Sequence, residues 1–375
     1  MIFGILKENE EENRVSLLPE GVDSLIKLGQ KVIVESGAGL NAFATDDEYK
    51  KIGAMIGNRT EIFQKAECIL KINPPVGSDL DSLRSGVILM GVYQPLFNPQ
   101  LIKTLSEKKV SVLSLDTIPR TTRAQSMDVL SSMSTISGYK AVLMAANHLP
   151  KFFPMLTTAA GTIAPAKALI LGAGVAGLQA IATAKRMGAV VYATDVRYAT
   201  KEQVESLGGK FIVVDEEKMK AAQTAGGYAK EMDDDFKRKQ AEAVRAEVAK
   251  SDIVITTALI PGKPAPRLVA ADVVALMKAG SVIVDLAAEA GGNVEGTVKD
   301  QVVTTSNGVT ILGYTNMSSR LGRDASSLFA KNILNFITLM LEKGTGNLKI
   351  NWDDELIKGT LVTKDGQVVH PSLAG

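Results

Sequence analysis

A glycine-rich turn between a strand pattern and a helix pattern constrains the fold of this chain more than any other feature. The segment "ALILGAGVAGLQA", residues 168–180, opens as an apolar run ending at Leu171 and continues as a helical pattern. Gly172, Gly174 and Gly177 lie between the two with the spacing G-x-G-x-x-G. In a βαβ unit these glycines allow a tight turn, a close backbone approach to phosphate and close packing of helix on strand. We therefore expect a dinucleotide pyrophosphate at the start of this helix rather than a plain helix-packing turn.

An acidic residue follows the motif at the distance that such a unit requires. Asp195 comes 18 residues after Gly177, next to the strand pattern in "VVYATDVR". A carboxylate there accepts hydrogen bonds from ribose hydroxyls and repels a 2′-phosphate, which predicts NAD(H) rather than NADP(H). Arg197 could accept a 2′-phosphate instead, but we favour its interpretation as a solvated surface side chain.

Short apolar runs rich in β-branched residues alternate with helical patterns along nearly the whole chain. Strands are expected at residues 2–6, 31–35, 68–72, 87–92, 110–115, 168–171, 190–194, 211–214, 253–256 and 282–285. Helices are expected at residues 21–28, 99–108, 127–148, 175–186, 235–249, 271–278 and 326–342. Strands separated by helices predict an α/β fold with parallel sheets covered on both faces. A turn at Asp365–Gly366 predicts a terminal hairpin.

The length of the chain, 375 residues, predicts two domains rather than one. The alternation breaks after Ile118 and again after Leu312, each time at a polar loop that leads into a long helix. We expect two Rossmann-like domains, one formed by residues 1–130 and 315–375 and the other by residues 131–314. The second would be the dinucleotide-binding domain, inserted into the first and joined to it by the two long helices, with a cleft between the domains.

A first candidate functional loop comprises residues 222–236 and contains Gly227 and Tyr228 in "AGGYAKEM". Connections in α/β units usually take about 2 to 6 residues, so this one is long. A hinged lid that carries an aromatic ring and an ordinary surface loop are equally consistent with its composition.

A second candidate loop, residues 116–132, follows a strand end, where open α/β sheets bind ligands. It brings together a cation, an amide, a carboxylate and a hydroxyl: Arg120, Gln125, Asp128 and Ser131. Such a set can hold a carboxamide and orient a nicotinamide ring. We expect Ser126 to be the N-cap of the following helix, with Asp128 in its first turn.

Composition excludes several classes of function. The 42 basic and 41 acidic residues nearly cancel, so nucleic-acid binding by phosphate neutralisation is not expected. The single cysteine, Cys68, excludes an internal disulfide and a multi-cysteine metal site, and we expect no metal. No apolar run reaches the roughly 18 residues of a membrane span, and the start of the chain, "MIFGILKENEEENRV", lacks a signal-peptide pattern. These features predict a soluble, cytoplasmic protein.

Only two histidines, His148 and His370, are available for acid–base chemistry. Oxidation of an alcohol or an amine needs a placed proton acceptor, which is usually a histidine. Exchange of a hydride between two nicotinamides moves no proton at the reacting carbon, and it needs only orientation and exclusion of water. The sequence therefore favours hydride exchange. Lys71 and Arg14 could bind a substrate carboxylate, but we favour a scaffold role for both.

Several long motifs carry a family resemblance. They are "RAQSMDVLSS", "GAGVAGLQAIATAKRMGA", "TKEQVESLGG", "GGYAKEM", "TTALIPGKPAP" and "GSVIVDLAAEAGGN". Together they resemble the soluble NAD(H)-binding component of proton-translocating NAD(P) transhydrogenases, along effectively the whole chain. Alanine dehydrogenases share the fold and have a different activity. At the position where alanine dehydrogenases carry a substrate-site histidine, this chain has "LMGVYQPLFN", which contains no histidine.

The resemblance implies a set of residues that contact NAD(H). The nicotinamide end would meet the catalytic residues Arg120, Gln125, Asp128 and Ser131 and, from the mobile loop, Tyr228. Further nucleotide contacts carry over to Ser126 and Met127, to Gly172, Gly174, Val175, Ala176 and Gly177, to Asp195, Val196 and Arg197, and to Gly227, Gln240 and Leu259. From the residues alone, Leu259 is a hydrophobe that anchors the loop before "PGKPAP".

The resemblance also implies an assembly. Family members are homodimers beside a membrane subunit and a separate NADP(H)-binding beta subunit. We therefore expect a proton-translocating, Si/Re-specific transhydrogenase in which this chain holds NAD(H) and lies at the cytoplasmic face of the inner membrane through its partners. Two other functions stay open: an alanine-dehydrogenase-type oxidoreductase that uses NAD, and a non-catalytic NAD-sensing module.

Overall fold

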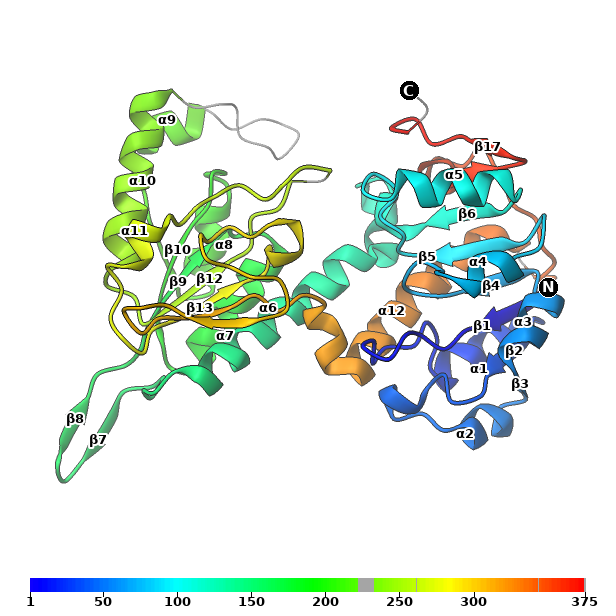
Figure 1. Ribbon diagram of the computed structural model, residues 1–375, viewed down its shortest axis with the longest axis horizontal. Coiled ribbons are helices and arrows are strands. Elements are labelled where there is room, and N and C mark those ends of the chain that lie inside the picture. Colours follow the sequence, from blue (N-terminus) through cyan, green and yellow to red (C-terminus); the bar gives the residue numbers. More distant parts are fainter. Residues whose placement is uncertain (222–232, 261, 343, 374–375) are drawn as a thin grey trace. The chain divides into compact units, whose positions relative to one another are not determined.

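The computed structural model describes residues 1–221, 233–260, 262–342 and 344–373. The chain divides into two compact units, Met1–Met133 with Ser318–Gly375 and Ser134–Met317. The second unit is inserted into the first, and helix α6 (Val129–His148) spans the first boundary. Figure 1 draws the first unit in blue, cyan, orange and red and the second in green to yellow.

The first unit is built on an eight-stranded sheet in the order β17-β16-β6-β5-β4-β1-β2-β3. Its strands are β1 (Ile2–Ile5), β2 (Lys31–Glu35), β3 (Met55–Gly57), β4 (Cys68–Leu70), β5 (Ile88–Gly91), β6 (Ser111–Ser114), β16 (Leu361–Lys364) and β17 (Gln367–Val368). Strands β1 to β6 are parallel, whereas β16 pairs antiparallel with both β6 and β17. The predicted terminal hairpin is confirmed, and its turn residues Asp365 and Gly366 both have positive φ.

Helices cover both faces of this sheet. They are α1 (Pro19–Lys27), α2 (Asp46–Lys51), α3 (Arg59–Lys65), α4 (Ser78–Ser82), α5 (Pro99–Glu107), α12 (Gly322–Ile337) and α13 (Glu355–Thr360). Because side chains alternate along a strand, Phe3 and Ile5 join one core with α1 and α12. Ile69 and Leu89 join the other core with α3 and α5. Burial on both faces explains why these strands are almost continuously apolar.

The second unit contains a seven-stranded sheet in the order β11-β10-β9-β12-β13-β15-β14. Its strands are β9 (Lys167–Leu171), β10 (Val190–Thr194), β11 (Lys210–Phe211), β12 (Ile253–Thr256), β13 (Val282–Asp285), β14 (Val302–Thr304) and β15 (Thr310–Leu312). Its helices include α7 (Val175–Arg186), α8 (Thr200–Ser206), α9 (Glu216–Ala221), α10 (Asp234–Val248) and α11 (Ala271–Val274). All neighbouring strands are parallel except the β14–β15 pair.

Strand β9 is the topological centre of the second sheet. It pairs with β10 on one side and with β12 on the other, so the chain reverses its direction of winding at β9. Ala168 and Ile170 face a core with α6 and α7, while Leu169 and Leu171 face a core with α10 and α11. Open α/β sheets bind ligands at the carboxyl end of such a switch point.

A short hairpin stands apart from this sheet. Strands β7 (Leu156–Thr158) and β8 (Gly161–Ile163) pair only with each other among the described residues and project from the rest of the second unit, as Figure 1 shows at lower left. The sequence patterns do not indicate this element, because two strands of three residues carry too few side chains to show an alternation.

The predicted α/β class with Rossmann-like, mainly parallel sheets is confirmed, although β14, β16 and β17 make both sheets mixed. Several predicted boundaries differ from the structure. The strand predicted at 211–214 is reduced to Lys210–Phe211, and the helix predicted at 271–278 ends at Val274. Element ends are the least well determined by local pattern. Among the described residues, no helix combines the length and the apolar character needed to cross a bilayer.

Candidate functional site

The glycine-rich turn joins the carboxyl end of β9 to the start of α7. Gly172 has a φ of +102°, and an added Cβ would lie 2.4 Å from Thr257 Oγ1. A Cβ on Gly177 would lie 1.9 Å from the carbonyl oxygen of Gly172, so α7 packs onto the turn only because that side chain is absent. Around Gly174, Arg197 Nη2 at 3.9 Å is the one described atom beyond its chain neighbours within 4 Å of an added Cβ. This open space fits a pyrophosphate that approaches the backbone.

The start of α7 offers backbone donors to such a group. Gly174 is the N-cap of α7 and makes no side-chain cap. The amides of Val175, Ala176 and Gly177 in the first turn have no acceptor within the helix. The helix also contributes a partial positive charge at this end. These residues could therefore hold the pyrophosphate of the NAD(H) that the sequence predicts.

Asp195 is only 8% exposed and accepts four hydrogen bonds, one from the glycine-rich turn and three from Arg197. Its Oδ2 accepts from the Ala173 amide at 2.7 Å and from Arg197 Nη2 at 2.8 Å. Its Oδ1 accepts from the amide and from Nε of Arg197, at 2.9 and 2.8 Å. Arg197 is therefore not the solvated surface side chain that we expected. It neutralises much of the charge with which Asp195 would repel a 2′-phosphate.

Apolar side chains are exposed next to this turn. Val175, Val196 and Leu259 are 43%, 56% and 57% exposed, and they follow the carboxyl ends of β9, β10 and β12. Exposed apolar groups beside a polar turn are typical of a ligand surface, here one that suits an adenine ring. The exposure argues against the alternative that Leu259 anchors its loop. Asn293 does so instead, because its side chain bonds the backbone amide and carbonyl of Ala258 at 3.0 and 2.9 Å.

One residue that supports the turn was missed by the sequence analysis. A Cβ on Gly138, within α6, would lie 2.1 Å from the carbonyl oxygen of Ala176. Helix α6 therefore approaches the first turn of α7 so closely that only glycine fits. A lone glycine inside a long helical pattern was the available signal, since glycine is unfavourable there without a packing reason.

The predicted lid residues Gly227 and Tyr228 lie outside the described residues, so the lid stays a prediction. The described helices on either side of that segment are linked, because Lys218 Nζ lies 2.8 Å from Oδ2 of Asp233, the N-cap of α10. Gln240 lies in α10, and its side chain is half-buried.

The second group of predicted residues follows β6 in the first unit. Arg120, Gln125 and Ser126 are exposed. Asp128, rather than Ser126, caps α6: its carboxylate accepts from the amide and the hydroxyl of Ser131 at 2.9 and 2.6 Å. The helix therefore begins two residues later than predicted, after a 3-10 turn that covers Thr122–Met127.

The backbone of this segment is anchored to its own unit. The Met127 side chain is 7% exposed and packs in the core, so only its backbone could meet a nucleotide. Arg123 forms an ion pair with Asp354, the N-cap of α13. Two asparagine side chains of α12 donate to the carbonyl of Ser126. A segment held in this way suits side chains that must orient a ring.

A half-buried carboxyl, Asp116, precedes the 3-10 turn. Burial raises the pKa of Asp116, although hydrogen bonds from Ser114 Oγ at 2.5 Å and from the Tyr93 amide at 3.2 Å favour the charged form. These bonds connect the ends of β5 and β6. A structural role therefore accounts for Asp116.

The cations that the sequence left open as substrate ligands are paired within the protein. Lys71 is fully buried, and its Nζ lies 3.0 Å from Oε2 of Glu8. Arg14 lies 2.6 Å from Glu12, and both side chains are buried. These pairs support the scaffold role for Lys71 and Arg14.

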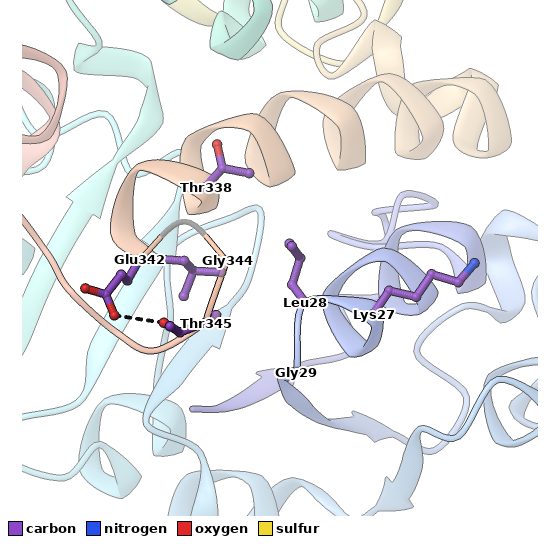
Figure 2. Close-up of a pocket in the computed structure, with 9 residues that line it drawn as sticks. Lys27, Leu28, Gly29, Thr338, Glu342, Gly344 and Thr345 are labelled. Carbon is purple, nitrogen blue, oxygen red and sulfur yellow. Dashed lines mark hydrogen bonds between the residues drawn. The ribbon is translucent and has the colours of Figure 1, made fainter.

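A cavity of about 460 Å³ lies elsewhere in the first unit. Figure 2 shows Leu28 and Gly29 on one side of it and Thr338, Glu342 and Thr345 on the other. Thr345 Oγ1 donates to Glu342 at 2.8 Å. Among the described residues that line this cavity there are no predicted site residues, so it is not the site that the sequence indicates.

The chain matches two family models. Residues 4–137 match "Alanine dehydrogenase/PNT, N-terminal domain", and residues 141–371 match "Alanine dehydrogenase/PNT, C-terminal domain". The chain is 52% identical to the first part of NAD(P) transhydrogenase subunit alpha from Rhodospirillum rubrum, over 100% of this chain and 99% of that protein. It is 30% identical to "Alanine dehydrogenase" of Methanococcus maripaludis, over 100% of this chain and 96% of that protein.

A solved structure supports the same relationship. The crystal structure of a transhydrogenase from Sinorhizobium meliloti is similar with a TM-score of 0.86 and 43% identity, over 99% of this chain and 100% of that chain. Sequence and fold agree along the whole length. The chain therefore belongs to the alanine dehydrogenase/PNT family and is related within it to the alpha subunits of NAD(P) transhydrogenase.

Proposed function

We propose that this chain is the NAD(H)-binding component of a proton-translocating NAD(P) transhydrogenase. It holds NAD(H) and exchanges a hydride with NADP(H) that a partner subunit holds. The observation that carries the proposal is the 52% identity to a transhydrogenase alpha subunit along the whole chain. The open turn at Gly174 supports binding of the dinucleotide by this chain itself.

Each group of residues has a separate task in this proposal. The turn from Gly172 to Gly177 binds the pyrophosphate. Asp195 accepts the ribose hydroxyls in exchange for hydrogen bonds from Arg197, because its acceptor positions are otherwise filled. The segment with Arg120, Gln125, Asp128 and Ser131 orients the nicotinamide, and Tyr228 excludes water from it. Bound NAD(H) supplies the hydride donor or acceptor. Orientation can supply much of the acceleration, since a misplacement of about 1 Å costs roughly 10²-fold in rate.

The state of the two histidines supports hydride exchange over substrate oxidation. His148 Nδ1 lies 2.9 Å from the carbonyl oxygen of Met144, and His370 Nε2 lies 3.1 Å from that of Gly359. His370 has both ring nitrogens engaged with local backbone, since its Nδ1 also accepts from the Ser372 amide at 3.3 Å. His148 is the last residue of α6, whereas Asp128 and Ser131 lie at the start of that helix, so it is not placed as a general base for the predicted nicotinamide segment. Transfer between two nicotinamides needs no such group.

The remaining roles fall to other chains. In this proposal a membrane subunit and an NADP(H)-binding beta subunit move the proton, and they hold this chain at the cytoplasmic face of the inner membrane. Si/Re specificity follows from which face of each nicotinamide the assembled subunits present to the other.

Reconstitution tests the proposal. We expect NADPH to reduce an NAD analogue only when this chain is mixed with the beta and membrane subunits of a transhydrogenase. Asp128→Asn should slow this transfer about 10²-fold while the dissociation constant for NADH changes less than about threefold, because the carboxylate orients the ring rather than anchoring the nucleotide. The measurements are absorbance of the reduced analogue and NADH fluorescence.

Other outcomes support other functions. NADH formation from NAD and a panel of amino acids by the chain alone would favour the alanine-dehydrogenase type. Tight NADH binding without transfer in any mixture would favour a sensing module. Rapid exchange by the chain alone would contradict the division of labour between subunits.

We propose further that the chain forms a homodimer through the β7–β8 hairpin. Residues 152–166 contain no charged side chain. Phe152, Met155 and Ile163 on and beside the hairpin are 53%, 62% and 41% exposed. An isolated two-stranded hairpin is marginally stable in water, so an uncharged one that projects from its unit favours coverage by a second copy.

Light scattering during size exclusion tests the dimer. The wild-type chain is expected to have the mass of a dimer, and Met155→Asp with Ile163→Asp should shift it to monomer because a charge in an apolar contact is costly. Val302→Asp, at an exposed apolar position on the edge strand β14, is the matched control and should leave the dimer intact. A wild-type monomer, or a dimer that survives both hairpin charges, would contradict this assignment.

A further inference from the structure

Two side chains of α12 converge on one backbone carbonyl of the predicted nicotinamide segment. Asn332 Nδ2 donates to the carbonyl oxygen of Ser126 at 2.9 Å, and Asn335 Nδ2 donates to the same oxygen at 3.0 Å. Residues three apart lie on one face of a helix, so both amides reach the segment from the same side. The chain separation is large, 206 and 209 residues, and both contacts lie within the first unit.

The carbonyl that they hold is central to the segment. Ser126 lies between Gln125 and Asp128, the amide and the carboxylate that the proposed function assigns to the nicotinamide. A fixed Ser126 carbonyl fixes the plane of the following peptide. The Met127 side chain, buried in the core, holds the other side of that peptide. The directions in which Gln125 and Asp128 leave the backbone therefore depend on this contact.

The contact places polar atoms in the protein interior without hydrogen-bond partners in the described part of the chain. Asn332 is 6% exposed, and its Oδ1 has no hydrogen-bond partner among the described residues. Thr121 Oγ1, at the start of the same 3-10 turn, is likewise buried and without such a partner. A buried polar atom without a partner is destabilising, and an apolar side chain at position 332 would avoid that penalty beside Phe329 and Ile333. Stability alone does not account for an asparagine there.

We propose that Asn332 and Asn335 are positioning residues of hydride transfer, which hold the Ser126 carbonyl and so orient Gln125 and Asp128 toward the nicotinamide. This inference rests on the proposed function. It adds two residues that act through the backbone of the segment and that no glycine or acid motif contains.

The test compares transfer with binding in the reconstituted transhydrogenase. Because both amides share one acceptor, Asn332→Leu or Asn335→Leu alone should slow transfer about two- to fivefold, and the double variant about 30- to 100-fold, which is more than the product of the singles. The dissociation constant for NADH should change less than about threefold in all of them. Lys331→Leu, exposed on the same helix, is the matched control and should transfer at the wild-type rate.

A stability measurement and a more conservative variant keep the inference open to contradiction. Should the double variant fail to fold, as judged by its urea unfolding midpoint, Asn335→Asp tests the same contact at a half-buried position, since it keeps the shape and removes the donor. It should slow transfer more than Asn335→Leu, because a carboxylate then faces a carbonyl oxygen.

The outcomes separate this inference from the proposed function. If Asp128→Asn slows transfer while the asparagine variants do not, the positioning role is wrong and the function stands. If Asp128→Asn leaves transfer unchanged, the assignment of the segment to the nicotinamide fails. Equal losses of transfer and of NADH affinity in the asparagine variants would show a merely structural contact and overturn the inference.

Discussion

Gly174→Ala should leave the fold of this chain intact and remove most of its affinity for NADH. Gly174 has a φ of −77°, which alanine adopts readily, and an added Cβ meets only Arg197 Nη2, at 3.9 Å, among the described atoms beyond the neighbouring residues. Alanine at an N-cap is less favourable than glycine by roughly 0.5 to 1 kcal/mol, which is too little to unfold a domain. The methyl group would, however, occupy the space that the pyrophosphate needs, and we expect an NADH dissociation constant at least about 10²-fold higher.

Gly177→Ala is the contrasting variant. Its Cβ would lie 1.9 Å from the carbonyl oxygen of Gly172, so α7 must move away from β9. Such overpacking costs about 1 to 3 kcal/mol or more, and both the unfolding midpoint and NADH affinity should fall. NADH fluorescence and urea denaturation measure the two quantities. Arg186→Ala, in the exposed last turn of α7, is the control that should change neither. Equal destabilisation by both glycine variants would refute the separate roles given to the two positions.

Asp195→Ala and Arg197→Gln should shift nucleotide selectivity in opposite directions. Without Asp195 the ribose hydroxyls lose their acceptor and Arg197 loses its partner, so we expect NADH to bind about 10- to 100-fold more weakly. The released guanidinium can pair with a 2′-phosphate, so NADPH should lose much less affinity. Without the Arg197 guanidinium, the Asp195 charge is no longer neutralised, and NADPH should be rejected more strongly.

Competition between NADH and NADPH, followed by nucleotide fluorescence, gives the selectivity directly. A ratio of the two affinities that is unchanged in Asp195→Ala would remove the carboxylate as the basis for choosing NAD(H). A ratio that moves in the same direction in both variants would show that the ion pair acts as a unit.

Local pattern predicted the α/β class and the glycine-rich turn because their causes are local. The positive φ of Gly172 and the contact between Gly177 and the Gly172 carbonyl involve residues five positions apart, and β9 and α7 each have their own hydrophobic period. Residue-by-residue contacts with NAD(H) stay predictions, and Gly227 and Tyr228 lie outside the described residues.

The misjudged features depend on where side chains point after folding. Arg197 is two residues from Asp195 in sequence, yet its pairing depends on the backbone direction after β10, which spacing does not reveal. Gly138 and Asn332 act on backbone atoms of other elements, so their roles emerge only when α6 meets α7 and α12 meets the 3-10 turn. Serine is a common N-cap residue, which favoured Ser126 in the sequence, but in the structure the carboxylate of Asp128 accepts the capping hydrogen bond from the Ser131 amide.

The pairing of β16 with β6 dictates when the first unit can be completed. Strand β6 leaves the ribosome early, whereas α12 and β16 follow the whole of the second unit. A nascent chain therefore carries β6 with an uncovered edge while an uninterrupted stretch, Ser134–Met317, can already close around its own core. Synthesis thus favours the second unit as the earlier folding event, and the first unit is completed only when the late C-terminal segment pairs with β6.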